Sequence, residues 1–347
     1  MPLLLSLAFY TGALPFLMAF KNYARVVAVP TYTVRESRVK ILALSLLTTY
    51  FALRSSFLVK FLFQGGIFAI FSIMQTYSKI RYEYATSESL SLVFQLGSIS
   101  YFCLMGAVGL ILSIKFRFSW ALIIVFISFI EMMEGTRARV LIGTVILLAE
   151  YIMARNSSLM RQNLRSYFIS FLFLFIVAAI IFFIPQYARI YNTDNVIEII
   201  LFDKLPSYTL AMYEALSLWI RERDLFVLDF GYNTFAGMFK FFGFTFQQGF
   251  YEFTHTNFGM TNIYTNMRNV LSDFGIIFSI FIYFFIGYMI GYASLKKVGF
   301  FHLMIVKLSL IFILFPINSP FIFANTVFGI SLFFLFYTFC FRYRVRW

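Results

Sequence analysis

The stretch "SDFGIIFSIFIYFFIGYMIGYAS", residues 272–294, decides the fold class. Between Asp273 and Lys296 it carries no charged residue, and its apolar residues form one continuous run. A run of about 20 apolar residues is long enough to cross the hydrocarbon core of a bilayer as an α-helix. The apolar residues do not alternate with polar ones, which argues against a strand of a membrane β-barrel. The stretch therefore predicts a transmembrane helix.

The composition of the whole chain agrees with this interpretation. Of its 347 residues, 61% are hydrophobic and only 12% are charged, whereas a soluble domain has about 25% charged residues. Similar apolar runs recur along the chain. They predict an all-α bundle of about nine transmembrane helices, within a range of about nine to eleven, at 2–20, 41–75, 89–114, 117–134, 138–154, 167–184, 272–294, 299–316 and 319–341. The run 41–75 contains Arg54 and Lys60, and it fits either one kinked helix or two short ones.

Basic residues mark one face of this predicted bundle. If 41–75 crosses the membrane once, the loop 21–40, the carboxyl-terminal tail and three short turns all fall on the same side. Together they hold fifteen basic residues and one acidic residue. Positive charge in short loops is typical of the cytoplasmic side. The amino terminus is therefore expected outside and the carboxyl terminus inside, and the net charge of +13 does not indicate a nucleic-acid partner.

The same topology divides the chain into an amino-terminal bundle (1–184), an outer loop (185–271) and carboxyl-terminal helices (272–347). The outer loop is expected to contain short helices. An apolar periodicity from Tyr208 to Leu218 predicts one that lies on the membrane surface, with Trp219 as its interfacial anchor. Enzymes of this architecture usually keep their chemistry in such a loop; a receptor-like loop is the alternative.

Motifs of soluble enzymes do not occur in the chain. It has no phosphate-binding loop, no HExxH and no GxSxG, and its two cysteines lie in predicted spans. No metal, nucleotide or other cofactor is therefore expected. Any reaction that the protein catalyses would therefore draw its energy from an activated substrate.

The turn "EMMEGTRARV", residues 131–140, concentrates four charges between two predicted spans on the outer face. The positive-inside rule disfavours arginine on the outer face unless it has a function there. A guanidinium group forms two parallel hydrogen bonds to phosphate oxygens. Arg137 and Arg139 therefore suggest an anionic ligand. The alternative is that Glu131 and Glu134 simply pair with the two arginines, which helical spacing allows.

A second polar segment, "TNIYTNMRNVLSDFG" (Thr261 to Gly275), precedes the seventh predicted span. If it is helical, Tyr264 stacks on Arg268, and Asn269 lies one turn from Asp273. It would place a cation and polar side chains at the outer membrane interface. The alternative for Asp273 is a helix N-cap.

These two segments carry a resemblance to a known family. With its large outer loop between them, the chain resembles the Wzy-type O-antigen polymerases, which belong with the oligosaccharide repeat-unit polymerases and O-antigen ligases. The first family motif, a small residue followed by Ser/Thr and Arg, matches Gly135-Thr136-Arg137. The second matches Asn262, Tyr264, Thr265, Asp273, Phe274 and Gly275. Ligases tend to carry a histidine where this chain has Thr261, which favours a polymerase.

The resemblance implies a metal-independent glycosyltransferase of the bacterial inner membrane, active at the periplasmic face in lipopolysaccharide biosynthesis. Its substrate would be an oligosaccharide linked to undecaprenyl diphosphate. A membrane protein that regulates chain length is a further implied partner. Arg137, Arg268 and Arg139 are the candidates to bind the diphosphate and Asp273 and His255 the candidate bases. The matched motif adds Asn262 and Tyr264 as substrate-binding residues.

Three other functions also fit the sequence. An O-antigen ligase or a capsular polysaccharide polymerase would use a similar site. A flippase for the same lipid-linked unit belongs to another class, and flippases usually have more spans, internal symmetry and a charged central cavity. The chain shows no internal repeat, which favours an enzyme.

Overall fold

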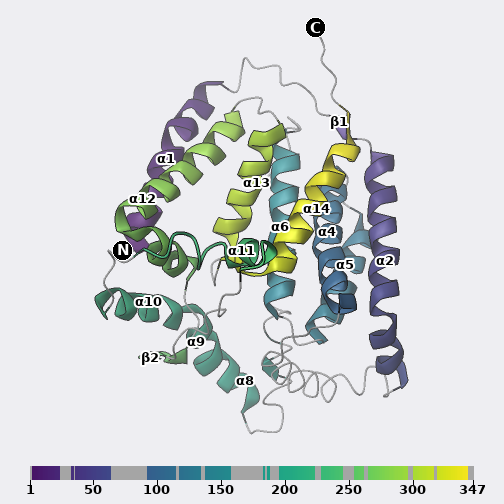
Figure 1. The fold of residues 1–347 in the computed structure, drawn as a ribbon, viewed down its shortest axis with the longest axis horizontal. Coiled ribbons are helices and arrows are strands. Elements are labelled where there is room, and N and C mark those ends of the chain that lie inside the picture. Colours follow the sequence, from purple (N-terminus) through teal and green to yellow (C-terminus); the bar gives the residue numbers. More distant parts are fainter. Residues whose placement is uncertain are drawn as a thin grey trace.

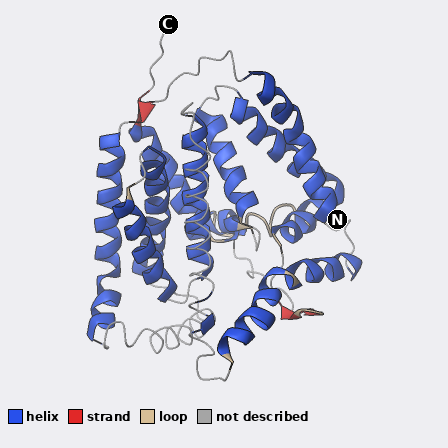
Figure 2. Cartoon of the chain, turned by 180° about the vertical axis from the view of Figure 1, so that it is seen from behind, coloured by secondary structure: helices blue, strands red, loops and turns tan. Residues whose placement is uncertain are grey.

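The computed structural model describes residues 2–23, 33–34, 36–63, 92–114, 117–133, 137–157, 183, 186–187, 195–222, 228–244, 254–261, 265–295, 300–315 and 319–342. These residues are mostly helical, as Figure 2 shows, and the all-α class is confirmed. The longer helices are α1 (Pro2–Tyr23), α2 (Glu36–Phe63), α4 (Leu92–Ile114), α5 (Phe118–Met133), α6 (Arg137–Ser157), α12 (Asn266–Leu295), α13 (Phe300–Leu314) and α14 (Ala324–Cys340).

Shorter elements connect or cap these helices. They are β1 (Thr33–Val34), α8 (Val196–Glu198), the π-helix η2 (Ile199–Lys204), α9 (Leu205–Thr209), α10 (Ala211–Glu222), α11 (Ala236–Phe241), β2 (Thr254–Thr256), β3 (Gly259–Thr261), the 3₁₀ helix η3 (Pro320–Ile322) and β4 (Phe341–Arg342). Two antiparallel pairs form, β1 with β4 and β2 with β3. The predicted outer loop therefore does contain short helices.

Helix α4 is the centre of the bundle. Every residue from Tyr101 to Leu112 is buried, and the helix packs against α2, α6 and α14 (Figure 1). Glycines permit these close approaches, because a Cβ at Gly109 would lie 2.6 Å from the Leu147 backbone oxygen on α6. Small residues at helix contacts are typical of packing inside a membrane.

Helix α12 lies on the other side of the bundle and pairs with α1. Gly12 and Gly287 let the two backbones meet, since a Cβ at either position would collide with a backbone oxygen of the partner helix. The outward face of α12 is apolar, with Ile277, Phe278 and Phe281 each more than 60% exposed. A large exposed apolar face of this kind marks contact with a membrane or a protein.

Two described helical stretches are long and apolar enough to cross a membrane, Gln95–Ile114 and Asn266–Tyr292. Shorter apolar helices occur at Leu3–Pro15, Phe118–Met132, Met304–Leu314 and Ala324–Phe336. This is a hint of a membrane protein, and the bundle of nine spans stays a prediction. The predicted span 167–184 lies, except for Phe183, outside the described residues.

Two predicted boundaries differ from the structure. The seventh span was predicted to begin at residue 272, but α12 begins at Asn266, because Arg268 and Asp273 are buried within it by specific contacts rather than excluded from it. The predicted run 41–75 overlaps α2, which is one helix from Glu36 to Phe63. The rest of the run, residues 64–75, lies outside the described part.

The pairing of β1 with β4 brings the start of α2 next to the end of α14. In Figure 1, β1 lies at this end of the bundle, and α8, α9 and α10 lie toward the opposite end. The charge bias predicts one common face for the 21–40 loop and the tail, and the strand pair agrees with that. Which face is cytoplasmic stays a prediction.

Helix α10 corrects one expectation about the outer loop. Its apolar side, with Ala215, Leu216 and Trp219, is buried in the main hydrophobic cluster of the protein. Trp219 is only 7% exposed. It is therefore not an interfacial anchor, because the apolar face that suggested membrane contact is already covered by protein.

Candidate functional site

The charged turn 131–140 connects to α2 through a buried ion cluster. Glu131, at the end of α5, accepts hydrogen bonds from Arg54 through its Oε1 (2.8 Å from Nη2 and 3.2 Å from Nε). Its Oε2 accepts one from Arg139 of α6 at 3.0 Å. Arg54 is 3% exposed, Glu131 is fully buried and the Arg139 side chain is 13% exposed. We call these three residues the Glu131 cluster.

Arg54 is held in this cluster by close packing as well as by charge. Its guanidinium carbon would lie 2.9 Å from a Cβ at Gly97 of α4, and it sits 5.9 Å from the centre of the Tyr50 ring. A larger residue at position 97 would therefore require the guanidinium group to shift. Arg54 falls inside the predicted span 41–75, and the sequence analysis assigns it no partner. An ionisable residue in such a span is a functional candidate by default.

The structure bears on one of the two interpretations of the turn, the pairing of its glutamates with its arginines. Glu131 does pair with Arg139, as the salt-bridge alternative predicted, but it also pairs with Arg54, which that alternative did not include. Glu134 lies outside the described residues, and so do Gly135 and Thr136. Arg137 is the first residue of α6. The amino-terminal end of a helix carries a partial positive charge, which favours an anion there.

A second polar group surrounds Asp273 in α12. The Asp273 carboxylate is fully buried and accepts hydrogen bonds from the backbone N–H groups of Asn233 (2.9 Å) and Thr234, as well as from the Asn233 side chain (3.0 Å). It therefore holds the turn that leads into α11. Asp273 is not the N-cap of α12, because that helix begins seven residues earlier, at Asn266.

Three further side chains complete this group. Asn233 also donates to Asp229 at 2.9 Å, Ser272 donates to Asp229 at 2.6 Å, and the Asn269 amide donates to the Asn233 carbonyl oxygen at 2.7 Å. Asn269 and Asp273 thus act on one face of the helix, as their spacing predicted. We call Asp229, Asn233, Thr234, Asn269, Ser272 and Asp273 the Asp273 cluster.

A break in α12 exposes the backbone that this cluster uses. Gly275 has φ 65° and ψ −176°, a conformation that is essentially restricted to glycine. Just before it, the carbonyl oxygens of Ser272 and Asp273 accept the N–H groups of Asp229 and Phe230 at 3.1 and 3.0 Å. The segment with Asp229 and Phe230 therefore supplies hydrogen bonds to α12 carbonyl groups where the helix is interrupted.

Arg268 lies near the start of α12 and contacts Trp219 of α10. Its guanidinium carbon is 5.0 Å from the centre of the Trp219 ring, within the range of a cation–π contact. The side chain is only 6% exposed. The predicted stacking partner, Tyr264, lies outside the described residues, as does Asn262.

His255, the second candidate base, stands apart from Asp273. It is exposed in β2 and pairs with Met260 of β3. The hairpin is tied to α10 because Asn257 donates to both carboxylate oxygens of Glu214. Among the hydrogen bonds between described residues, none joins His255 to the Asp273 cluster. The catalytic roles of Asp273 and His255 stay predictions.

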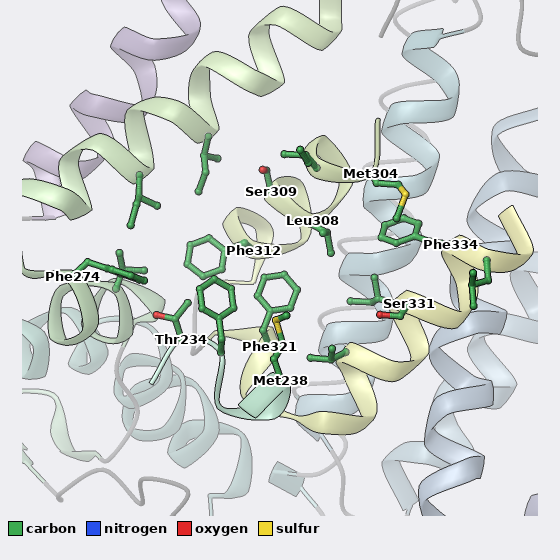
Figure 3. A pocket seen from close by; sticks show the side chains of 18 residues that line it. Thr234, Met238, Phe274, Met304, Leu308, Ser309, Phe312, Phe321, Ser331 and Phe334 are labelled. Atoms are coloured by element: carbon green, nitrogen blue, oxygen red, sulfur yellow. The ribbon is translucent and has the colours of Figure 1, made fainter. Parts of the chain in front are cut away.

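An apolar cavity of about 670 Å³ adjoins the Asp273 cluster. Figure 3 shows side chains entering it from α12, α13, η3, α14 and the turn before α11. Two of its lining residues connect it to that cluster. Thr234 donates its N–H to Asp273, and Phe274 follows Asp273 in the sequence. The remaining lining is largely aliphatic and aromatic, including Met304, Phe312, Phe321, Ile330 and Phe334. No local sequence pattern predicts this cavity, because its walls come from segments that are distant in the chain.

A further buried ion pair joins α6 and α13. Lys307 donates to Glu150 at 2.6 Å, and both side chains are at most 2% exposed. Each falls inside a predicted span, at 138–154 and 299–316. Among the described residues, no group of three or more His, Cys, Asp or Glu side chains is placed to hold a metal ion.

Comparison with known proteins adds no relative: no protein-family model, no curated protein and no solved structure matches the chain.

Proposed function

We propose that the chain is a membrane glycosyltransferase that polymerises O-antigen repeat units carried on undecaprenyl diphosphate, at the periplasmic face of the inner membrane. The acceptor hydroxyl of the incoming lipid-linked unit attacks the anomeric carbon of the growing chain. A new C–O bond forms as the bond from that carbon to the diphosphate oxygen breaks. The hydroxyl proton passes to a base, and undecaprenyl diphosphate leaves with the bonding electrons.

The observation that carries the proposal is the contact between a polar cluster and an apolar cavity. Thr234 donates its N–H to Asp273 and also lines the cavity of about 670 Å³. A site with this layout suits an amphiphile that has a polar head and a long hydrocarbon tail. Small-molecule sites are typically apolar with a few placed polar groups, and a polyprenyl diphosphate sugar has this division of chemistry.

Arginines are the candidates to supply the positive charge that the leaving group requires. A departing diphosphate gains negative charge in the transition state, and fixed cations at a site with little water stabilise that charge most strongly. Arg139 and Arg268 are both held by neighbouring side chains, and Arg137 is the first residue of α6, two residues before Arg139 in the sequence. Preorganised cations of this kind act without a metal.

Deletion of the gene tests the proposal. The surface polysaccharide of the deletion strain is separated on a gel and compared with that of the parent and of a complemented strain. We expect the lipopolysaccharide core to carry a single repeat unit in place of a ladder. A bare core would indicate a ligase or a flippase, and loss of a capsule with an unchanged ladder would indicate a capsular polymerase. An unchanged ladder together with an intact capsule would refute all of these functions.

Independence from metal and nucleotide is a separate prediction. The energy of transfer comes from the glycosyl diphosphate bond, and among the described residues no group of three or more His, Cys, Asp or Glu side chains is placed to hold a metal ion. Purified protein should extend lipid-linked repeat units in EDTA and without ATP at the rate seen with added magnesium. Activity that EDTA removes and a divalent ion restores would contradict this expectation.

A further inference from the structure

The Asp273 cluster contains two carboxylates in different surroundings. Asp273 is fully buried, and its two oxygens accept hydrogen bonds from the turn into α11, Oδ1 from Asn233 and Oδ2 from the Thr234 N–H. Asp229 is partly exposed, and its Oδ2 accepts hydrogen bonds from Asn233 at 2.9 Å and from Ser272 at 2.6 Å. Asp273 therefore holds the backbone of the turn, whereas the Asp229 carboxylate is oriented by side chains and can be reached from outside.

The backbone around Asp229 is strained and fixed. Phe230 has φ 48°, which is a true outlier for a bulky residue, and its side chain is 72% exposed. Burial of the ring therefore does not account for the conformation. The Asp229 N–H donates to the Ser272 carbonyl oxygen at 3.1 Å, and the Phe230 N–H donates to that of Asp273 at 3.0 Å. Backbone strain that the surrounding structure holds in place is typical of functional sites.

The same segment lies at one end of the apolar cavity. A Cβ at Gly231 would lie 3.4 Å from Phe235 and 3.8 Å from Phe274, and both of these side chains line the cavity. Figure 3 shows Phe274 and Phe334 on opposite sides of the cavity. A lipid whose hydrocarbon tail occupies the cavity would thus have its polar head on the side of Asp229.

We infer that Asp229 is the catalytic base that takes the proton from the acceptor hydroxyl. This inference rests on the proposed function for the identity of the substrate. As the acceptor oxygen bonds to the anomeric carbon, its proton passes to the Asp229 carboxylate, and undecaprenyl diphosphate leaves with the electrons of the broken bond. A carboxylate can accept about four hydrogen bonds, so a hydroxyl can join the contacts that Asp229 already makes. A base has to come within hydrogen-bond distance of the proton that it takes, which favours Asp229 over the fully buried Asp273.

Asp229→Asn tests the inference with the smallest change of shape. The amide oxygen of asparagine can accept the same hydrogen bonds from Asn233 and Ser272, but asparagine does not take up the proton. The full chain in detergent is assayed with undecaprenyl-diphosphate-linked repeat units extracted from the deletion strain. We expect kcat to fall about 100- to 10,000-fold. KM should stay within about threefold of the wild-type value, as for an interaction made only in the transition state.

Asp203→Asn is the matched control. Asp203 is an exposed carboxylate of η2 in the predicted outer loop, and its replacement should leave both constants unchanged. A loss of less than about 100-fold in kcat of Asp229→Asn, measured per folded molecule, would overturn the assignment of the base.

Formate separates a base from a structural acceptor. In Asp229→Ala the carboxylate is missing, and added formate should raise the rate about tenfold, a part of the 100- to 10,000-fold that a positioned base contributes. Formamide has a similar size and no charge, so it should leave the rate unchanged. Rescue by both additives or by neither contradicts the proposal. Failure of both Asp229 variants to accumulate would assign the residue to the fold and would contradict it as well.

The outcome for Asp229 is distinguishable from the outcome for the proposed function. A wild-type protein that extends the repeat units, together with an Asp229→Asn variant that keeps its rate, would retain the polymerase and remove the base. An unchanged polysaccharide ladder in the deletion strain would remove the polymerase, and this role of Asp229 with it.

Discussion

Arg137→Ala should abolish polymerisation while the protein still inserts and accumulates. Arg137 is the first residue of α6, where the positive end of the helix already favours an anion, and it follows the Gly-Thr pair of the first family motif. Removal of one contact made in the transition state typically costs about 3–4 kcal/mol, or two to three orders of magnitude in rate. The measurement is the distribution of polysaccharide chain lengths in a complemented deletion strain.

Two further variants separate a ligand contact from a structural one. Arg137→Lys should rescue polymerisation only in part, because lysine keeps the charge and loses the fork of donors. Arg221→Ala is the control, since Arg221 is an exposed arginine of α10 in the predicted outer loop. Loss of an exposed ion pair costs at most about 1 kcal/mol of stability. A normal ladder from Arg137→Ala at normal protein levels would show that Arg137 is not part of the site.

The helical class was predictable because it depends on local information. Length and continuity of apolar runs are properties of neighbouring residues, and most predicted spans coincide with described helices such as α4 and α6. The start of α12 was misplaced by six residues for the same reason. Arg268 and Asp273 appear to end an apolar run when only neighbours are considered, and their burial depends on Trp219 and Asn233, which are distant in the sequence.

The two polar clusters of the candidate site were predictable as a set of segments and not as a set of contacts. The charged turn and the segment around Asp273 were both identified, since a concentration of charge in an apolar chain is visible in sequence. The partner of each charge was not. Arg54 and Glu131 are 77 residues apart and Asn233 and Asp273 are 40 apart, and no short-range spacing rule such as i,i+4 reaches so far. The break at Gly275 was equally hidden, because one glycine two residues after an aspartate fits many turns.

Lys307→Met should sharply reduce the amount of folded protein. Lys307 and Glu150 lie 157 residues apart in sequence and meet at 2.6 Å in the interior, between α13 and α6. Loss of the lysine leaves a carboxylate buried beside apolar side chains. Breaking such a buried pair typically costs about 3–5 kcal/mol, which is a large part of the roughly 5–15 kcal/mol that stabilises a typical protein. The measurement is the thermal unfolding of protein purified in detergent, together with its level in the membrane.

The double variant Glu150→Met, Lys307→Met decides what the pair contributes. Replacement of both charges by apolar side chains of similar size is often neutral or stabilising, so the double variant should recover the stability that the single variant lost. Lys40→Met is the matched control, because Lys40 pairs with Glu36 while about a third of each side chain is exposed, and its loss should cost at most about 1 kcal/mol. Recovery of stability together with polymer would establish the pair as structural. A stable double variant that makes no polymer would contradict that assignment and place the charge of Lys307 or Glu150 in the reaction itself.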